Sequence, residues 1–195
     1  MYNHIQGRVT EKTPTYVVID CGGVGYLVNI SLYTYSHLPD TEHCRLFTHL
    51  AVKEDAHTLF GFIDEEERRL FRLLISVSGV GAATARMILS SLSPAEIQQA
   101  ITTADVLRLQ SVKGIGAKTA QRIIIDLGDK LKRGEMASAV VLSGAGNRIK
   151  EQALSALVTL GFSRNVAEKA VDGVLRNNAE EPTVEQIIKL ALNNL

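Results

Sequence analysis

The sequence has little cysteine and no long apolar run, and these absences exclude several classes of protein. Its two cysteines, Cys21 and Cys44, form no CxxC pair in 195 residues. A zinc site or a disulfide framework is therefore not expected, and a reducing compartment fits best. No apolar run approaches the roughly 18 residues that span a bilayer, and no basic segment followed by an apolar one marks a secretory signal. We expect a cytoplasmic protein without a membrane segment.

The chain as a whole has no surplus of charge of either sign, since 21 basic residues balance 21 acidic ones. The charges are nevertheless segregated, because residues 1–63 have a net charge of −2 and residues 68–134 have a net charge of +7. A local basic region of this kind can bind a polyanion even when the whole chain is neutral. The five histidines all precede residue 58 and have no metal-ligand spacing, so neither a metal nor a cofactor is predicted.

The first 62 residues have the alternation of apolar and polar side chains that is typical of strands. Five strands are predicted, at residues 5–9, 15–20, 25–30, 45–52 and 58–62. Turn-forming residues separate them, and the longest connection covers residues 31–40. Five short strands in so short a stretch predict a small barrel. The OB-fold is the leading candidate, and an SH3-like barrel fits nearly as well.

From residue 64 onward the pattern changes to helices. Asp64 with Glu67 three residues later predicts a capping box, and Ser93-Pro94-Ala95-Glu96 predicts a second helix start. Residues 134–147 lose this periodicity and are rich in small side chains, as in a flexible linker.

Three apolar stripes at helical spacing follow in residues 148–195. Gly161 is expected to end the first helix, and Thr183 with Gln186 is expected to cap the third. The whole pattern predicts an α+β multidomain protein, with a barrel at 1–63, a helical domain at 64–133, a linker at 134–147 and a three-helix bundle at 148–195. Small tethered domains of this kind commonly serve as docking modules.

An internal repeat in the helical domain is the most informative feature. Residues 76–92 read SVSGVGAATARMILSSL and residues 111–127 read SVKGIGAKTAQRIIIDL, with nine of 17 aligned positions identical. Each copy holds a Gly-hydrophobic-Gly turn between helical segments, and the offset of 35 residues indicates a duplication. The repeat predicts two helix-hairpin-helix units.

The residue types of the turn have physical reasons. Glycine supplies a positive φ and removes the Cβ that would block a close neighbour. The central Val80 or Ile115 is expected to point inward, while freed backbone amides and the helix dipole form an anion site outside. Lys118 and Arg122, four residues apart, can add two charges to the phosphate contact. Because backbone amides contact a phosphate without reading a base, we expect binding that is largely independent of DNA sequence.

The predicted DNA-binding residues come from both copies of the turn and from the helices that follow. They are Gly79, Val80, Gly81, Arg86, Gly114, Ile115, Gly116, Lys118, Thr119 and Arg122.

Two nucleotide-binding motifs are excluded by spacing. A P-loop that ends at Lys118-Thr119 needs glycine at positions 112 and 117, where this chain has Val112 and Ala117. A dinucleotide fingerprint needs a third glycine where Thr84 and Thr119 stand.

Several motifs, in order along essentially the whole chain, resemble the RuvA family of bacterial Holliday-junction branch-migration proteins. They are GGVGY at 22–26, FTH at 47–49, EDA at 54–56, FGF at 60–62, Leu70-Phe71, GVGAATA at 79–85, GIGAKTA at 114–120 and ALVTLGF at 156–162.

The resemblance implies an OB-fold, a paired helix-hairpin-helix domain and a tethered three-helix domain. It also implies a homotetramer that holds a four-way DNA junction open and flat, with a RuvB-type hexameric ATPase and a RuvC-type resolvase as partners. Glu54 and Asp55 resemble the family's acidic pin, whose carboxylates repel phosphates and need perform no acid–base chemistry. Relatives often have lysine where this chain has Ala82-Ala83, so its first hairpin is expected to rely on backbone amides and Arg86.

Residues 148–195 are predicted to dock the motor. Branch migration requires work, and the sequence has no nucleotide-hydrolysing machinery of its own, so the motor must be a separate protein. Leu157, Leu160 and Phe162 are the candidate contact residues, on the expectation that so small a bundle leaves some apolar side chains partly exposed.

Two other classes of protein stay open on the residues alone. A helix-hairpin-helix glycosylase or nuclease would need a catalytic Asp in a loop beyond the hairpin, and Asp126 and Asp129 follow the second hairpin within a helical pattern. A plain scaffold would use the C-terminal bundle as its only functional surface. The prediction favoured here is a DNA-binding protein that is not itself an enzyme.

Overall fold

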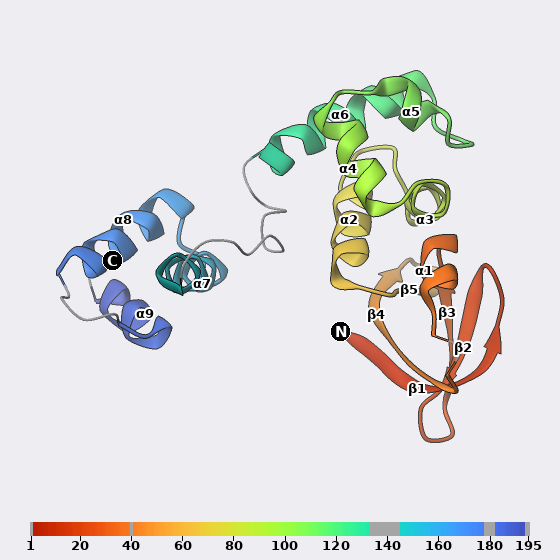
Figure 1. Ribbon diagram of the computed structural model, residues 1–195, viewed down its shortest axis with the longest axis horizontal. Helices are drawn as coiled ribbons and strands as arrows, with labels where there is room; N and C mark the ends of the chain where they lie inside the picture. Colours follow the sequence, from red (N-terminus) through yellow and green to blue (C-terminus); the bar gives the residue numbers. More distant parts are fainter. Residues whose placement is uncertain (1, 40, 133–144, 178–181, 194–195) are drawn as a thin grey trace. The chain divides into compact units, whose positions relative to one another are not determined.

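The computed structural model describes residues 2–39, 41–132, 145–177 and 182–193. The chain forms two compact units, residues 1–139 and residues 140–195, and each has a hydrophobic core of its own. Unit 1 contains a barrel and a set of helices joined by α2, as Figure 1 shows.

Five strands close into a barrel at the N-terminal end of unit 1. They are β1 (His4–Lys12), β2 (Tyr16–Asp20), β3 (Gly25–Ile30), β4 (His43–Val52) and β5 (His57–Phe62). Their order around the barrel is β1-β2-β3-β5-β4, with β1 paired to β4 and a parallel pairing between β3 and β5. This is the strand order of an OB-fold, so the leading prediction is confirmed and the SH3-like alternative is set aside.

The connection at residues 31–40 contains a short helix that the sequence pattern did not predict, α1 (Leu32–His37). Ser31 caps it, because the Ser31 hydroxyl accepts a hydrogen bond from the Thr34 amide at 2.9 Å. Six residues are too few for a helical period to stand out in the sequence.

The rest of unit 1 is helical, and the core of its helices includes Phe60 and Phe62 of the barrel, while the barrel also has a separate core of its own. The helices are α2 (Glu65–Ile75), α3 (Ala82–Ser91), α4 (Pro94–Thr102), α5 (Val106–Gln110) and α6 (Ala117–Lys132). Phe71 of α2 is fully buried, and its ring centroid lies 5.2 Å from that of Phe60 and 4.9 Å from that of Phe62. Because Phe60 and Phe62 belong to β5, aromatic packing joins the barrel to the helices.

The predicted capping box at the start of α2 is half wrong. The Asp64 carboxylate does accept from the Glu67 amide at 2.7 Å, so Asp64 caps the helix. The Glu67 side chain, however, is fully buried and accepts hydrogen bonds from Ser31, Thr34 and the Ile63 amide. Tertiary contacts with the barrel have replaced the local bond that the pattern predicted. The capping box predicted at Ser93 and Glu96 is complete.

Unit 2 contains three helices, α7 (Ala145–Thr159), α8 (Arg164–Asn177) and α9 (Val184–Leu192). Gly161 ends the first helix with φ +103°, and Thr183 with Gln186 forms a complete capping box, as predicted. Of the predicted linker, residues 134–144 lie outside the described residues, and α7 already begins within the predicted linker at Ala145. Among the described helices, none is long and apolar enough to cross a membrane.

Candidate nucleic-acid interface

The two hairpin turns have the same backbone geometry. Gly79 and Gly114 both have φ +90°, the left-handed region that favours glycine. The amide of Val80 donates to the Val77 carbonyl, and the amide of Ile115 donates to the Val112 carbonyl, both at 3.0 Å. The sequence duplication is therefore also a structural duplication.

The residue between the two glycines anchors each turn in the core. Val80 is 4% exposed and Ile115 is 6% exposed, as the repeat predicted. One turn further on, Ala85 and Ala120 are fully buried, and their amides donate to the Gly81 and Gly116 carbonyls. The apolar side chains of each hairpin therefore pack into the core, and the backbone of the turn faces outward.

The second glycine of each turn has open space where a side chain would be. A Cβ added at Gly81 or at Gly116 would meet no atom of the described residues within 4 Å, and neither residue has a positive φ. Gly81 is also the N-cap of α3 and offers no side chain to the first amides of the helix. A helix start with amides free of a side-chain cap and no Cβ nearby can admit an anion close to the backbone.

The charged side chains differ between the two hairpins. Lys118 and Arg122 are exposed at the start of α6, one helical turn apart, and Thr119 between them is half-buried. Lys113, immediately before Gly114, is exposed as well, and the sequence reasoning missed it although a lysine inside the turn was the signal. The first copy has no basic residue between positions 77 and 85. The basic surface therefore lies on the second hairpin.

Arg86, which was predicted to bind DNA, contacts the barrel in the structure. Its guanidinium donates to the Thr15 carbonyl and to the Asn29 side-chain oxygen, each at 3.0 Å. These bonds tie α3 to the barrel, so Arg86 is half-buried and already engaged. The first hairpin is left with its backbone amides as the outward-facing groups.

Glu54 and Asp55 lie in the turn between β4 and β5, as predicted. The turn is closed by the Lys53 amide, which donates to the Ala56 carbonyl at 2.9 Å. Both carboxylates are exposed, and within the described parts of the chain neither makes a hydrogen bond or an ion pair. The turn therefore presents two uncompensated negative charges to solvent.

His49 and the arginines of α2 give the barrel side of this helix an unusual electrostatic environment. Burial lowers the pKa of His49, and Arg72 and Arg68 lower it further. The His49 ring packs 5.3 Å from the Phe71 ring, and its buried Nδ1 atom has no hydrogen-bond partner among the residues that the structure describes. Arg68 is buried too, and donates to the Asn3 carbonyl at 2.7 Å. A neutral His49 fits this position best.

In unit 2 the structure corrects one of the predicted contact residues. Leu157 is fully buried in the bundle core, because it packs with residues from all three helices, so a partner cannot reach it in the folded bundle. Leu160 is 60% exposed, and Phe162 is half-buried against the same core. Leu160 is therefore the accessible member of the predicted set.

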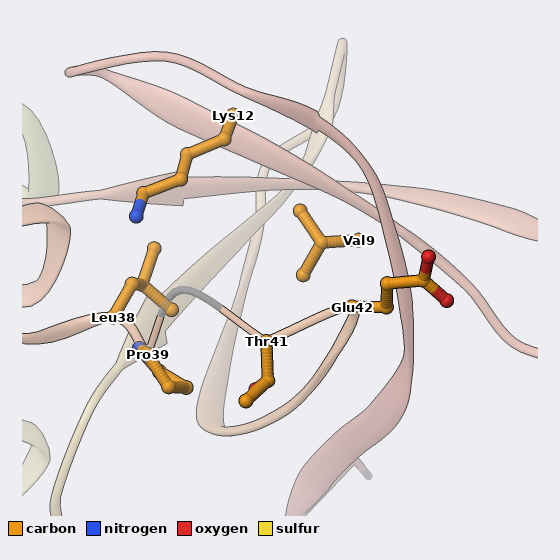
Figure 2. Close-up of a pocket in the computed structure, with 6 residues that line it drawn as sticks. All are labelled: Val9, Lys12, Leu38, Pro39, Thr41 and Glu42. Carbon is orange, nitrogen blue, oxygen red and sulfur yellow. The ribbon is translucent and has the colours of Figure 1, made fainter.

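A surface pocket on the barrel has no part in this interface. It has a volume of about 250 Å³ and lies on the barrel beside β1 (Figure 2). Lys12 extends over it and lies 5.5 Å from the Tyr35 ring centroid, and none of the predicted site residues lines it. The described residues also contain no group of three side chains that could hold a metal ion.

Asp126 is not placed as a helix-hairpin-helix glycosylase would require. It is an exposed residue inside α6 rather than in a loop beyond the hairpin. The side chain of Asp129 lies outside the described residues. The position of Asp126 counts against the enzyme alternative.

An OB-type barrel joined to a tandem helix-hairpin-helix defines a class of proteins built from nucleic-acid-binding folds. The chain belongs to the RuvA family. Residues 1–61 match the RuvA N terminal domain, residues 71–129 match the SAM-like helix-hairpin-helix tandem, and residues 149–195 match the RuvA C-terminal domain.

Curated relatives match over the full length of both chains. The chain is 55% identical to the Holliday junction branch migration complex subunit RuvA of Christiangramia forsetii and 54% identical to that of Flavobacterium psychrophilum. It is 49% identical to the protein of the same name from Bacteroides fragilis. Each of these alignments covers 100% of this chain and 100% of the relative.

Proposed function

We propose that this protein binds four-way DNA junctions through their backbone phosphates, without reading base sequence. The observation that supports this most directly is the open space at Gly81 and Gly116, beside two helix starts of matching geometry. Gly81 and Gly116 stand beside the first amides of a helix, so the open space at these two positions would admit a ligand that approaches the backbone closely, as a phosphate does. The names of the relatives point to a junction as the DNA that is bound.

The second hairpin supplies most of the electrostatic attraction in this proposal. Lys113, Lys118 and Arg122 are all exposed around it, whereas the first copy has no basic residue between positions 77 and 85. Lysine and arginine that neutralise phosphates release counterions, so this attraction weakens as salt rises.

In this proposal, Glu54 and Asp55 give the protein its preference for junctions over duplex DNA. Two exposed carboxylates on one turn repel the phosphates of any strand that approaches them. At a junction, strands must separate and turn away from the centre, and repulsion there favours that path. A continuous duplex has no such centre and gains nothing from it.

The protein itself is non-catalytic in this proposal, and unit 2 docks a RuvB-type hexameric ATPase that performs the work of branch migration. Leu160 is the exposed apolar candidate for that contact. A homotetramer would present one set of hairpins to each arm of the junction, and a RuvC-type resolvase would be a further partner. Cys21 and Cys44 are free thiols, in keeping with a reducing cytoplasm.

The test compares the double variant Lys118→Ala/Arg122→Ala with the wild-type chain on a synthetic four-way junction and on a duplex. A matched control removes two exposed charges from unit 2, with Arg176→Ala/Lys189→Ala. The hairpin variant should bind both DNAs more weakly, and its salt slope should fall by about 0.9 for each phosphate that a bound subunit no longer neutralises. The control should leave both quantities unchanged. Wild-type affinity and slope in the hairpin variant would remove these cations from the interface.

A further inference from the structure

One buried carboxylate fastens α2 to the barrel. Glu67 is fully buried, and so are Ser31 and Thr34, which donate their hydroxyl hydrogens to its two carboxylate oxygens. The Thr34 bond is 2.6 Å long, and the Ile63 amide donates to the same oxygen of Glu67 at 3.1 Å. The donors come from the start of α1 and from the residue that follows β5. One side chain of α2 therefore holds two parts of the barrel at once.

Glu67 and its three donors, the hydroxyls of Ser31 and Thr34 and the amide of Ile63, form a buried polar cluster. In the described part of the chain Glu67 makes no ion pair, and its charge is held by neutral donors alone. Burial is the largest influence on Glu67 and raises its pKa, and the hydrogen bonds from Ser31, Thr34 and Ile63 oppose that rise. Apolar residues of similar volume would fill the space without this desolvation cost. Hydrogen bonds are directional, so what the carboxylate adds is a defined orientation of α2 on the barrel.

The location of the cluster gives that orientation a consequence. β5 begins just after the turn that contains Glu54 and Asp55, and it ends just before α2. α2 then leads directly into the first hairpin at Gly79 (Figure 1). The acidic turn and the hairpins are therefore joined through the point where strand becomes helix, and Glu67 fixes that point.

We propose that Glu67 is a positioning residue that sets the spacing between the acidic turn and the phosphate-binding hairpins, and thereby the preference for junctions over duplex. This inference rests on the proposed function. A duplex needs only the hairpins, and the hairpins stay intact when α2 shifts on the barrel. A junction needs the hairpins and the acidic turn in register, so the two affinities should respond differently to loss of the cluster.

The test uses Glu67→Gln and Thr34→Val, with Glu66→Gln as the matched control. Glu66 is the adjacent exposed carboxylate of α2, and its contact is with Gln98 at 2.6 Å rather than with the barrel. Both cluster variants should keep duplex affinity within about twofold and lose about tenfold in junction affinity, because the acidic turn and the hairpins would no longer be held in register. The control should keep both affinities. An unchanged ratio of junction to duplex affinity in a folded cluster variant overturns the proposal, and Thr34→Val decides the matter if Glu67→Gln does not fold.

A readout without DNA separates this inference from the proposed function. Two dyes placed at Lys53 and Lys113 by amber suppression report the distance between the acidic turn and the second hairpin, and both positions are exposed. Glu67→Gln should broaden or shift the distance distribution, and Glu66→Gln should not. A changed distance without any junction preference in the wild-type chain would refute the proposed function alone. An unchanged distance would refute the positioning role even if the wild type prefers junctions.

Discussion

Substitution by alanine should lower stability at one glycine of the second hairpin and leave it nearly unchanged at the other. Gly114 has φ +90°, so Gly114→Ala forces a Cβ into the left-handed region and should cost about 1–3 kcal/mol of stability. Gly116 lacks a positive φ, and an added Cβ would meet nothing within 4 Å in the described part of the chain. Gly116→Ala should therefore change the free energy of unfolding by no more than about 0.5 kcal/mol.

Gly116→Ala should mainly weaken DNA binding, whereas Gly114→Ala should mainly lower stability. A methyl group at position 116 occupies the space through which a phosphate would approach the amides at the start of α6. The loss of one amide–phosphate hydrogen bond predicts a weakening of about tenfold or more, since bonds to charged groups contribute about 1.5–3 kcal/mol. The factor should be similar for every DNA sequence, because no base is contacted.

The assay combines urea unfolding with fluorescence anisotropy on labelled duplexes of two unrelated sequences. Gly173→Ala is the matched control, since Gly173 lies in α8 of unit 2 and a Cβ there also meets no described atom within 4 Å. It should leave DNA binding unchanged. A Gly116→Ala protein that is stable and binds both duplexes like the wild type would refute the assignment of the open space to a phosphate.

Three further predictions concern the acidic turn, His49 and unit 2. Glu54→Gln with Asp55→Asn should preserve or tighten binding to duplex, because removal of repulsion cannot weaken attraction, and the preference for junctions should fall. A folded double variant that binds all DNA markedly less would exclude the repulsive role. His49 has a pKa below its ordinary value of 6.5, so the unfolded chain binds more protons and stability should fall as pH falls below about 6.5. A His49→Phe variant should lose this part of the pH dependence in urea titrations from about pH 7 to about pH 5, and an unchanged slope would contradict the assignment. Truncation after Lys132 should leave junction binding nearly intact and abolish stimulation of a RuvB-type ATPase, and full stimulation by the truncated chain would disprove the docking role.

Much of the architecture was predictable because its signals are local. The five strands were found from alternation, and the repeat at an offset of 35 residues located both hairpins. The left-handed φ of Gly79 and Gly114 and the burial of Val80 and Ile115 followed from the residue types at those positions.

What the sequence did not reveal depends on contacts between distant residues. Glu67 follows Asp64 at capping-box spacing, yet its partners include Ser31 and Thr34, more than 30 positions away, and no local pattern contains them. Arg86 stands in a hairpin helix, but its guanidinium contacts Asn29 of the barrel. Burial made the same difference in unit 2, where Leu157 and Leu160 share an apolar stripe and only Leu160 is exposed.

The most direct test of the central proposal is a competition experiment with the full-length chain. A labelled four-way junction is bound by the protein, and unlabelled junctions and linear duplexes with the same arm sequences compete, in two unrelated sequence sets at one salt concentration. We predict that junctions compete far better than duplexes and that both sequence sets give the same ratio. Equal competition by junction and duplex, or a ratio that depends on base sequence, would contradict the proposal.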